Sequence, residues 1–207
     1  MTTGAAVRSA TRTALDWLRW RWRGQRDPDS LAFDAIHGTD TASFDLADYE
    51  PTPPAVAERV LDAVVTALGA DGVRDASFVD LGCGKGRVLL LAAQRGFGRV
   101  LGVEHDRRLA AIGRANARRV AVHVEVFEQD AADFELPLGE RVLFMYNPFP
   151  ADVLEAVMTR AALAPTWLAY VHPVDEARVL AAGFAEIARG DDRLEPRWRV
   201  FRGTWSR

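Results

Sequence analysis

The sequence is poor in cysteine, and this excludes several kinds of site. Cys83 is the single cysteine among the 207 residues, so the chain forms no internal disulfide and offers no cluster of thiolates for zinc. We therefore expect no metal site. A chain without disulfides is typical of a reducing compartment, and the sequence predicts a cytoplasmic protein.

The sequence also lacks a long apolar run and a strong excess of charge of one sign. No stretch approaches the roughly 20 apolar residues of a membrane span, and the first residues contain no continuous apolar segment of the signal-peptide type. The formal net charge of -3 and the isoelectric point near 5.8 argue against a surface that binds nucleic acid over its whole extent. With 49% hydrophobic residues, the chain can bury the core of one large domain.

Residues 1–30 carry an excess of basic charge that the rest of the chain lacks. Apolar side chains recur at helical spacing over residues 6–23, which predicts an amphipathic helix with arginines along a neighbouring stripe. This helix could pack on the main domain or on a second subunit, which would make the protein an oligomer. Alternatively, the arginines with Trp17, Trp20 and Trp22 could bind an anionic partner such as RNA. We favour the first interpretation.

Residues 24–54 contain turn signals and prolines. The run Asp27-Pro28-Asp29-Ser30 predicts a turn within an irregular stretch, and prolines stiffen the segment just before the next helix. That proline-rich segment could lie over a ligand pocket as a lid, with Tyr49 and Thr52 facing inward, or it could be a plain connector. We divide the chain accordingly: residues 1–54 hold the basic helix and the lid-like segment, and residues 55–207 form the main domain.

From residue 56 onward, apolar runs typical of strands alternate with helical patterns. Such alternation predicts an α/β fold, with a doubly wound, mostly parallel, Rossmann-like sheet and helices on both faces. The last strands would close the sheet in the antiparallel direction. The predicted strands are 76–81, 99–103, 120–127, 141–146, 167–171, 184–188 and 197–205, and the predicted helices are 56–68, 87–93, 106–117, 151–163 and 174–182.

A glycine-rich loop follows the first predicted strand and precedes a helix. The loop reads Gly82-Cys83-Gly84-Lys85-Gly86, and its glycines allow a sharp bend and the approach of a ligand to the backbone. The helix N-terminus adds N–H groups and the positive end of a dipole. We interpret Cys83 as a small residue packed within the loop and Lys85 as a solvated residue.

An acidic residue, Glu104, follows the second predicted strand and suits both hydroxyls of a ribose. This arrangement is shared by dinucleotide binders and other nucleoside binders. The dinucleotide pattern G-x-G-x-x-G needs a glycine at position 87, where this chain has Arg87. Asp80 beside the loop would repel a pyrophosphate but suits an ammonium group. The residues therefore favour a nucleoside cofactor that has no pyrophosphate.

Four motifs, taken in order, resemble those of the class I S-adenosylmethionine-dependent methyltransferases. They are Asp80 to Gly86, Glu104 after the second strand, Asp130-Ala131 after the third, and Asn147-Pro148-Phe149 after the fourth. The resemblance spans roughly residues 50–205 and implies a seven-stranded sheet with S-adenosyl-L-methionine as cofactor. It also implies methyl transfer to a nucleophilic acceptor, which we expect to be a nitrogen of a protein side chain or of a small amine.

The resemblance assigns roles to the motif residues. Asp80 would hold the methionine end of the cofactor, Glu104 the ribose hydroxyls, and Asp130 the adenine amino group. The full set implied for the cofactor is Asp80, Gly82, Cys83, Gly84, Gly86, Glu104, Asp130, Ala131 and Asn147.

The same family assigns the acceptor to the motif after the fourth strand. Asn147 would accept a hydrogen bond from the acceptor nitrogen, Pro148 would fix the backbone, and Phe149 would pack on the substrate. If the acceptor is an ammonium, His172 at the end of the fifth strand could deprotonate it, although a histidine at such a position can also be structural.

Two other readings remain open at this point. A nicotinamide-dependent oxidoreductase with an aberrant glycine loop would share the strand and helix order. A non-catalytic scaffold could keep the fold, bind the cofactor and present the basic N-terminal helix to a partner.

Overall fold

The computed structural model describes residues 28–42, 49–120, 123–146, 149–191 and 195–204, so the helix predicted over residues 6–23 lies outside the described residues. The helices are α2 (Pro28–His37), α3 (Pro54–Asp75), α4 (Arg87–Gln94), α5 (Arg107–Val120), α6 (Ala151–Ala161) and α7 (Glu176–Ala181). The strands are β1 (Ser77–Leu81), β2 (Arg99–Glu104), β3 (Val124–Glu128), β4 (Arg141–Tyr146), β5 (Thr166–Val171), β6 (Phe184–Gly190) and β7 (Trp198–Gly203).

The strands form one 7-stranded sheet in the order β3-β2-β1-β4-β5-β7-β6. Strands β1 to β5 pair in parallel, and β7 runs antiparallel to both of its neighbours, β5 and β6. From β1 the chain proceeds outward to β3 and then returns to the other side of β1 to form β4. The predicted doubly wound sheet with an antiparallel closing strand is confirmed, and its switch point lies between β1 and β4.

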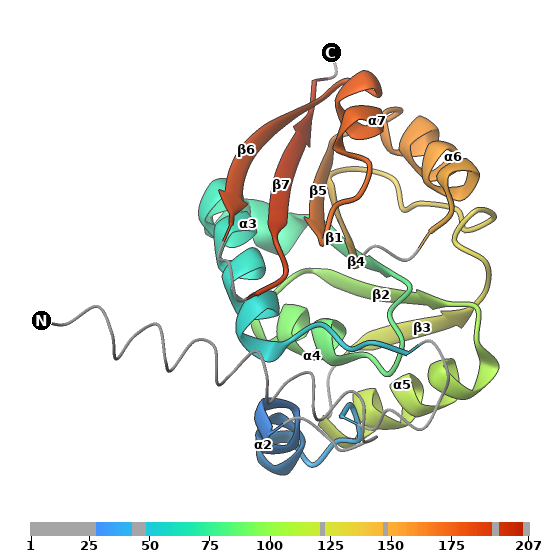
Figure 1. Ribbon diagram of the computed structural model, residues 1–207. Helices are drawn as coiled ribbons and strands as arrows, with labels where there is room; N and C mark the ends of the chain where they lie inside the picture. Colours follow the sequence, from blue (N-terminus) through green and yellow to red (C-terminus); the bar gives the residue numbers. More distant parts are fainter. Residues whose placement is uncertain (1–27, 43–48, 121–122, 147–148, 192–194, 205–207) are drawn as a thin grey trace, which may run out of the picture.

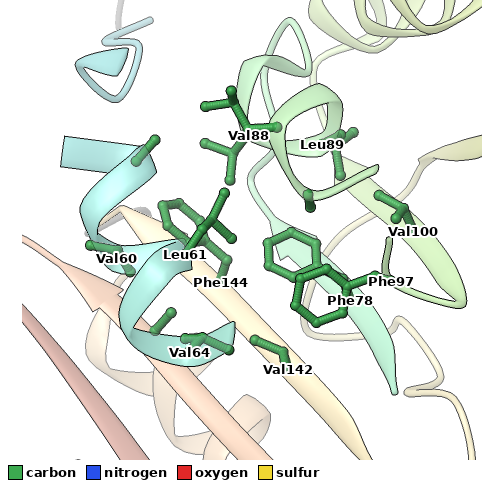
Figure 2. Close-up of a cluster of buried hydrophobic side chains, with 14 of the residues drawn as sticks. Val60, Leu61, Val64, Phe78, Val88, Leu89, Phe97, Val100, Val142 and Phe144 are labelled. Carbon is green, nitrogen blue, oxygen red and sulfur yellow. The ribbon is translucent and has the colours of Figure 1, made fainter. Parts of the chain in front are cut away.

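Helices lie on both faces of the sheet (Figure 1), and hydrophobic side chains fill a layer on each face. On one face, α3 and α4 pack on apolar residues of the central strands, and Figure 2 shows Val60, Leu61 and Val64 of α3 directed toward this layer. The rings of Phe78 and Phe97 lie there with centroids 5.1 Å apart. On the other face, α6 and α7 cover a second cluster. Burial on both faces explains why the central strands are apolar throughout instead of alternating.

One predicted irregular segment is a helix instead. The run from Pro28 to Ser30, predicted as a turn, begins α2. Proline is favoured in the first turn of a helix because its missing N–H has no partner to lose there, and Asp29 suits the positive end of the helix dipole. The turn prediction was therefore wrong because both kinds of segment begin with the same residues.

The helix predicted over residues 56–68 is confirmed and is longer, because α3 continues past Gly69 to Asp75. Gly69 has φ +71° and breaks the helical geometry within this element. Phe33 of α2 lies in the core cluster beneath α3. The division of the chain at residue 54 stays a prediction. None of the helices in the described part of the chain is long and apolar enough to cross a membrane.

Candidate active site

A cavity of about 500 Å³ opens at the carboxyl ends of β1, β2 and β4. Open parallel sheets bind ligands in this position, beside the switch point. The lining residues come mainly from the glycine loop, from the ends of β1, β2 and β4, from the turns after β3 and β5, and from the segment before α3. The predicted site residues that line the cavity are Tyr49, Thr52, Asp80, Gly82, Cys83, Gly84, Glu104, Asp130, Ala131, Phe149 and His172.

The glycine loop runs from β1 to α4 in a left-handed backbone conformation. Gly82, Gly84 and Gly86 have φ values of +80°, +53° and +85°, a region that L-residues with a Cβ rarely adopt. Gly84 is also close to a neighbouring side chain, because a Cβ at this position would lie 2.5 Å from Cε2 of Tyr49. Gly86 precedes the first residue of α4 and is not among the residues that line the cavity.

Glu104 is buried at the end of β2 and holds the glycine loop through its side chain. Its Oε2 accepts a hydrogen bond from the backbone N–H of Gly84 at 2.9 Å, and its Oε1 accepts one from the N–H of Asp106 at 2.8 Å. Asp106 in turn caps α5, accepting from the N–H groups of Arg108 and Leu109. One carboxylate therefore joins the loop after β1 to the turn after β2.

Asp80 lies under the same loop and is 3% exposed. Burial raises the pKa of this carboxyl well above 3.8, and the nearby Glu104 carboxylate adds to the increase. Burial likewise raises the pKa of the Cys83 thiol, with a further contribution from Asp80. Cys83 packs tightly on β2, since a Cβ at Gly102 would lie 2.7 Å from its sulfur. The thiol is therefore a buried packing group and not a reactive thiolate.

Residues after β3 complete this end of the cavity. The N–H of Gln129 donates to the carbonyl oxygen of Glu104 at 3.1 Å, which fixes the turn beside β2. The Asp130 side chain is exposed and accepts a hydrogen bond from the N–H of Ala132 at 2.7 Å. Asp130 and the buried Ala131 both line the cavity.

The segments before α3, residues 28–42 and 49–53, form an N-terminal cover over the glycine loop. Thr41 and Thr52 are buried, and both bind Arg87 at the start of α4: Nε donates to Thr41 Oγ1 at 2.9 Å, and Nη1 donates to the Thr52 carbonyl oxygen at 2.8 Å. The Tyr49 hydroxyl donates to the carbonyl oxygen of Thr41 at 3.2 Å. Burial raises the pKa of Tyr49, so this hydroxyl remains protonated.

A second set of contacts fixes the cover to α5. Asn116 is completely buried, and its Nδ2 donates to the carbonyl oxygens of Lys85 at 2.9 Å and Asp40 at 3.1 Å. Its Oδ1 accepts from the Asp40 N–H. Lys85 is 0% exposed, its ammonium lying 3.7 Å from Asp40 Oδ1 and 5.3 Å from the centroid of the Tyr49 ring. The prediction of a solvated Lys85 was wrong because the cover supplies it with a carboxylate and an aromatic face.

The other end of the cavity is formed by a group of residues that we call the mouth cluster: Glu50, Tyr146, Phe149 and His172. The Tyr146 hydroxyl donates to Oε1 of Glu50 at 3.2 Å, and the rings of Tyr146 and His172 have centroids 6.1 Å apart. His172 has φ +49°, and its N–H donates to the Arg197 carbonyl oxygen at 2.7 Å. A non-glycine residue in this region is held there by its surroundings and often belongs to a functional site.

The structure thus brings together most residues that the sequence singled out, with three exceptions. Gly86 does not line the cavity. Asn147 and Pro148 lie outside the described residues, so their predicted positions are not tested. Sequence reasoning missed Glu50, Tyr146 and the role of Arg87. In the sequence, Arg87 argues only against a dinucleotide motif, because it stands where that motif has a glycine. A buried arginine at the start of a helix also needs hydrogen-bond acceptors, and that need is a signal of its contacts with the cover.

The residues that the structure describes contain no group of three or more His, Cys, Asp or Glu side chains that could hold a metal ion.

Comparison with known proteins adds independent information. Residues 78–164 match the model of a protein family described as a methyltransferase domain. No curated protein sequence matches this chain.

Among solved structures, the chain is similar to the magnesium protoporphyrin IX methyltransferase of Synechocystis PCC 6803, with 21% identity over 72% of this chain and 81% of that chain (TM-score 0.55). It is also similar to the putative methyltransferase yhhF of Escherichia coli, with 15% identity over 78% and 90% of the two chains (TM-score 0.61). A third similar structure is the 16S rRNA N2 G1207 methyltransferase of T. thermophilus, with 20% identity over 77% of this chain and 44% of that chain (TM-score 0.56).

The matched residues begin within β1 and contain the glycine loop, Glu104 and Asp130. The structural similarities independently support the fold. The family match assigns a methyltransferase domain to residues 78–164, and the sheet order agrees with the fold of the similar structures.

Proposed function

We propose that this methyltransferase transfers the methyl group of S-adenosylmethionine to a nitrogen atom of a protein side chain or of a small amine. The observation that carries this proposal is a single cavity with two chemically different ends. One end has the carboxyl groups and loop backbone expected for the cofactor. The other has aromatic rings and His172, and one of these rings belongs to Phe149, the last residue of the Asn147-Pro148-Phe149 motif.

At the first end, each part of the cofactor has a residue that could bind it. Asp80 is a buried carboxyl beside a loop whose backbone is accessible at Gly82 and Gly84, which suits the ammonium of the methionine part. Glu104 accepts from Gly84 at one oxygen, and each carboxylate oxygen has two acceptor sites, so it retains capacity for a ribose diol. Asp130, with Ala131 beside it, would accept from the adenine amino group.

Methyl transfer from this cofactor does not require a nucleophilic side chain. S-adenosylmethionine, when bound, supplies a methyl group on a good leaving group, so the protein mainly has to align the acceptor and exclude water. The N-terminal cover would serve this purpose, because Tyr49 and Thr52 both line the cavity from above the loop. Phe149 would pack on the acceptor, and Asn147 would orient its nitrogen.

A protonated amine must lose a proton before it can attack. His172 is the histidine at the mouth cluster and is exposed, so a proton taken from the acceptor could pass to solvent. Its constrained backbone, with φ +49°, fixes the direction of the side chain, and the Tyr146 ring lies beside the imidazole. We assign it the general base.

The direct test is methyl transfer from labelled S-adenosylmethionine to a desalted lysate of the source cell, followed by identification of the labelled atom. We expect label on nitrogen in a protein or a small molecule. Label only on oxygen, carbon or sulfur would refute the proposed acceptor class. The absence of any labelled product, together with measurable cofactor binding, would favour a non-catalytic scaffold. The family match already favours a methyltransferase over a nicotinamide-dependent oxidoreductase.

A further inference from the structure

Acidic side chains outnumber basic ones in the lining of the cavity. Among the described residues that line it, Glu50, Asp80, Glu104 and Asp130 carry carboxyl groups, and Arg87 carries the guanidinium. That guanidinium is 2% exposed and donates to Thr41 and Thr52 of the cover through two of its nitrogens, and the four carboxyl groups outnumber it. An acceptor entering the cavity therefore meets a negative potential, which repels phosphate and carboxylate groups and attracts cations.

The cofactor accounts for only part of this negative charge. Three of the four carboxyl groups lie at the ends of β1 and β2 and after β3, where the cofactor would bind. Glu50 lies apart from them, within the mouth cluster, where it accepts a hydrogen bond from the Tyr146 hydroxyl at 3.2 Å. Tyr146 ends β4, on the opposite side of β1 from β2 and β3. The Glu50 carboxylate is thus placed on the acceptor side of the switch point.

The surroundings of Glu50 add a second feature. The rings of Tyr146 and Phe149 line the same end of the cavity and are partly buried. Aromatic faces beside a carboxylate form an environment that attracts an ammonium group, because the ring quadrupole and the negative charge act in the same direction. A neutral nucleobase nitrogen or an amide could donate a hydrogen bond to this carboxylate but would lack the attraction between opposite charges that an ammonium gains.

We infer that Glu50, held by Tyr146, is a specificity-determining residue that selects a cationic alkylamine as the methyl acceptor. The inference rests on the proposed function and narrows it from any nitrogen to an aliphatic amine that arrives protonated. The carboxylate attracts and positions the ammonium among the rings, and the acceptor nitrogen attacks the methyl group after it has lost its proton. The ammonium gives a proton to His172, and the lone pair of the acceptor nitrogen forms the nitrogen–carbon bond with the methyl group. The sulfur–carbon bond breaks with its electron pair on sulfur, which leaves S-adenosylhomocysteine as the second product.

The test uses the full chain, labelled S-adenosylmethionine and the lysate acceptor, with kinetics of three variants. Glu50→Gln removes the charge but preserves the size of the side chain. Tyr146→Phe keeps the ring and removes the hydroxyl that holds Glu50. Glu58→Gln is the matched control, since Glu58 is exposed on α3 and does not line the cavity. The dissociation constant of S-adenosylhomocysteine is measured for each variant to confirm that the cofactor end is intact.

We expect the label on an aliphatic amine, and we expect Glu50→Gln to raise KM for that acceptor at least about tenfold, roughly the effect of 1.4 kcal/mol. Tyr146→Phe should raise KM less, and Glu58→Gln should leave it unchanged. The cofactor affinity should be the same in all variants.

Each other outcome is decisive. An aliphatic amine product with an unchanged KM in Glu50→Gln overturns the role of Glu50. Label on a nucleobase or an amide nitrogen overturns the inference and leaves the proposed function standing. A lack of any nitrogen-linked label refutes the proposed function itself, and the inference fails with it.

Discussion

Arg87 and Thr52 are joined by a hydrogen bond of 2.8 Å between a guanidinium nitrogen at the start of α4 and a backbone carbonyl oxygen of the N-terminal cover. The same side chain also reaches Thr41 Oγ1, and its guanidinium carbon lies 5.4 Å from the centroid of the Phe33 ring. The helix that follows the glycine loop thus holds the cover at two separate points. Because the cover lines the cavity, Arg87 connects the start of α4 to this part of the cavity wall.

Replacing Arg87 with lysine should weaken both the fold and the site. Lysine keeps the charge but lacks the planar fork that reaches two acceptors at once, so we expect a loss of about 1.5–3 kcal/mol in the free energy of unfolding. Urea unfolding measures this loss. The affinity for S-adenosylhomocysteine should fall too, because Thr52 and Tyr49 line the cavity. The control is Arg95→Lys after the same helix, whose partner Asp62 is exposed and whose loss should cost about 0.5 kcal/mol or less.

Gly84→Ala tests the close approach of the loop to Tyr49. The left-handed backbone alone should cost about 1–2 kcal/mol, and the added methyl would displace the Tyr49 ring, since an ideal Cβ lies 2.5 Å from Cε2. We expect cofactor affinity to fall sharply. Gly96→Ala isolates the strain, because Gly96 has φ +84° and no atom lies within 4 Å of the place that the added methyl would take. Equal loss of cofactor affinity in both variants would contradict a local role of Gly84.

Asp80→Asn should change the stability of the cofactor-free protein in a pH-dependent way. The pKa of Asp80 in the folded protein is raised above 3.8 by burial and then by Glu104, so ionisation of this group costs stability. Its contribution is most favourable below pH 3.8 and is lost as the pH rises through the raised pKa. The asparagine variant should therefore gain stability relative to the wild type as the pH rises. Urea midpoints measured across the pH range check the sign.

The cofactor should reverse this preference. An ammonium group beside Asp80 favours the ionised carboxylate, so wild-type affinity should increase with pH and binding should release a proton. Calorimetry in two buffers of different ionisation enthalpy detects that proton. Asp80→Asn should bind weakly and without proton release, while Asp133→Asn, an exposed carboxyl outside the cavity, should behave like the wild type. A pH-independent wild-type affinity would refute the assignment of Asp80.

Asn147→Ala should separate binding from catalysis. If Asn147 orients the acceptor nitrogen, its loss should leave the dissociation constant of S-adenosylhomocysteine unchanged and lower kcat by about 100-fold, the scale of a misplaced reacting group. Steady-state kinetics with the identified acceptor measure the effect. An unaltered kcat would remove Asn147 from the mechanism.

Local patterns were sufficient to predict most of the fold. The bounds of β1, β2, β4 and β5 agree with the predicted strands to within a residue or so, because a strand buried on both faces is an uninterrupted apolar run. The helix predicted over residues 106–117 is confirmed as α5, and its cap, Asp106, acts on N–H groups close to it in the sequence. By contrast, α2 was missed, since proline and aspartate begin turns and helices alike.

The site residues that escaped prediction depend on contacts between distant parts of the chain. The partners of Arg87 lie 46 and 35 positions away, and the partner of Tyr146 lies 96 positions away. Hydrophobic periodicity depends on residues that are close in the sequence, so it cannot predict pairs that are this far apart. Lys85 was misjudged for the same reason, because the groups that bury it come from Asp40 and Tyr49. The motif residues that line the cavity could be found from the sequence because each lies at or shortly after the end of its own strand.

Glu104 has a consequence for anyone who wishes to redesign the enzyme for a cofactor analogue with a modified ribose. The obvious substitution would be at this residue, but its carboxylate also accepts from the N–H groups of Gly84 and Asp106. Removing it would release the glycine loop and the turn before α5 together with the ribose contact that we propose. Altered sugar selectivity is therefore better sought in the neighbouring turn at Gln129, which reaches Glu104 only through the backbone.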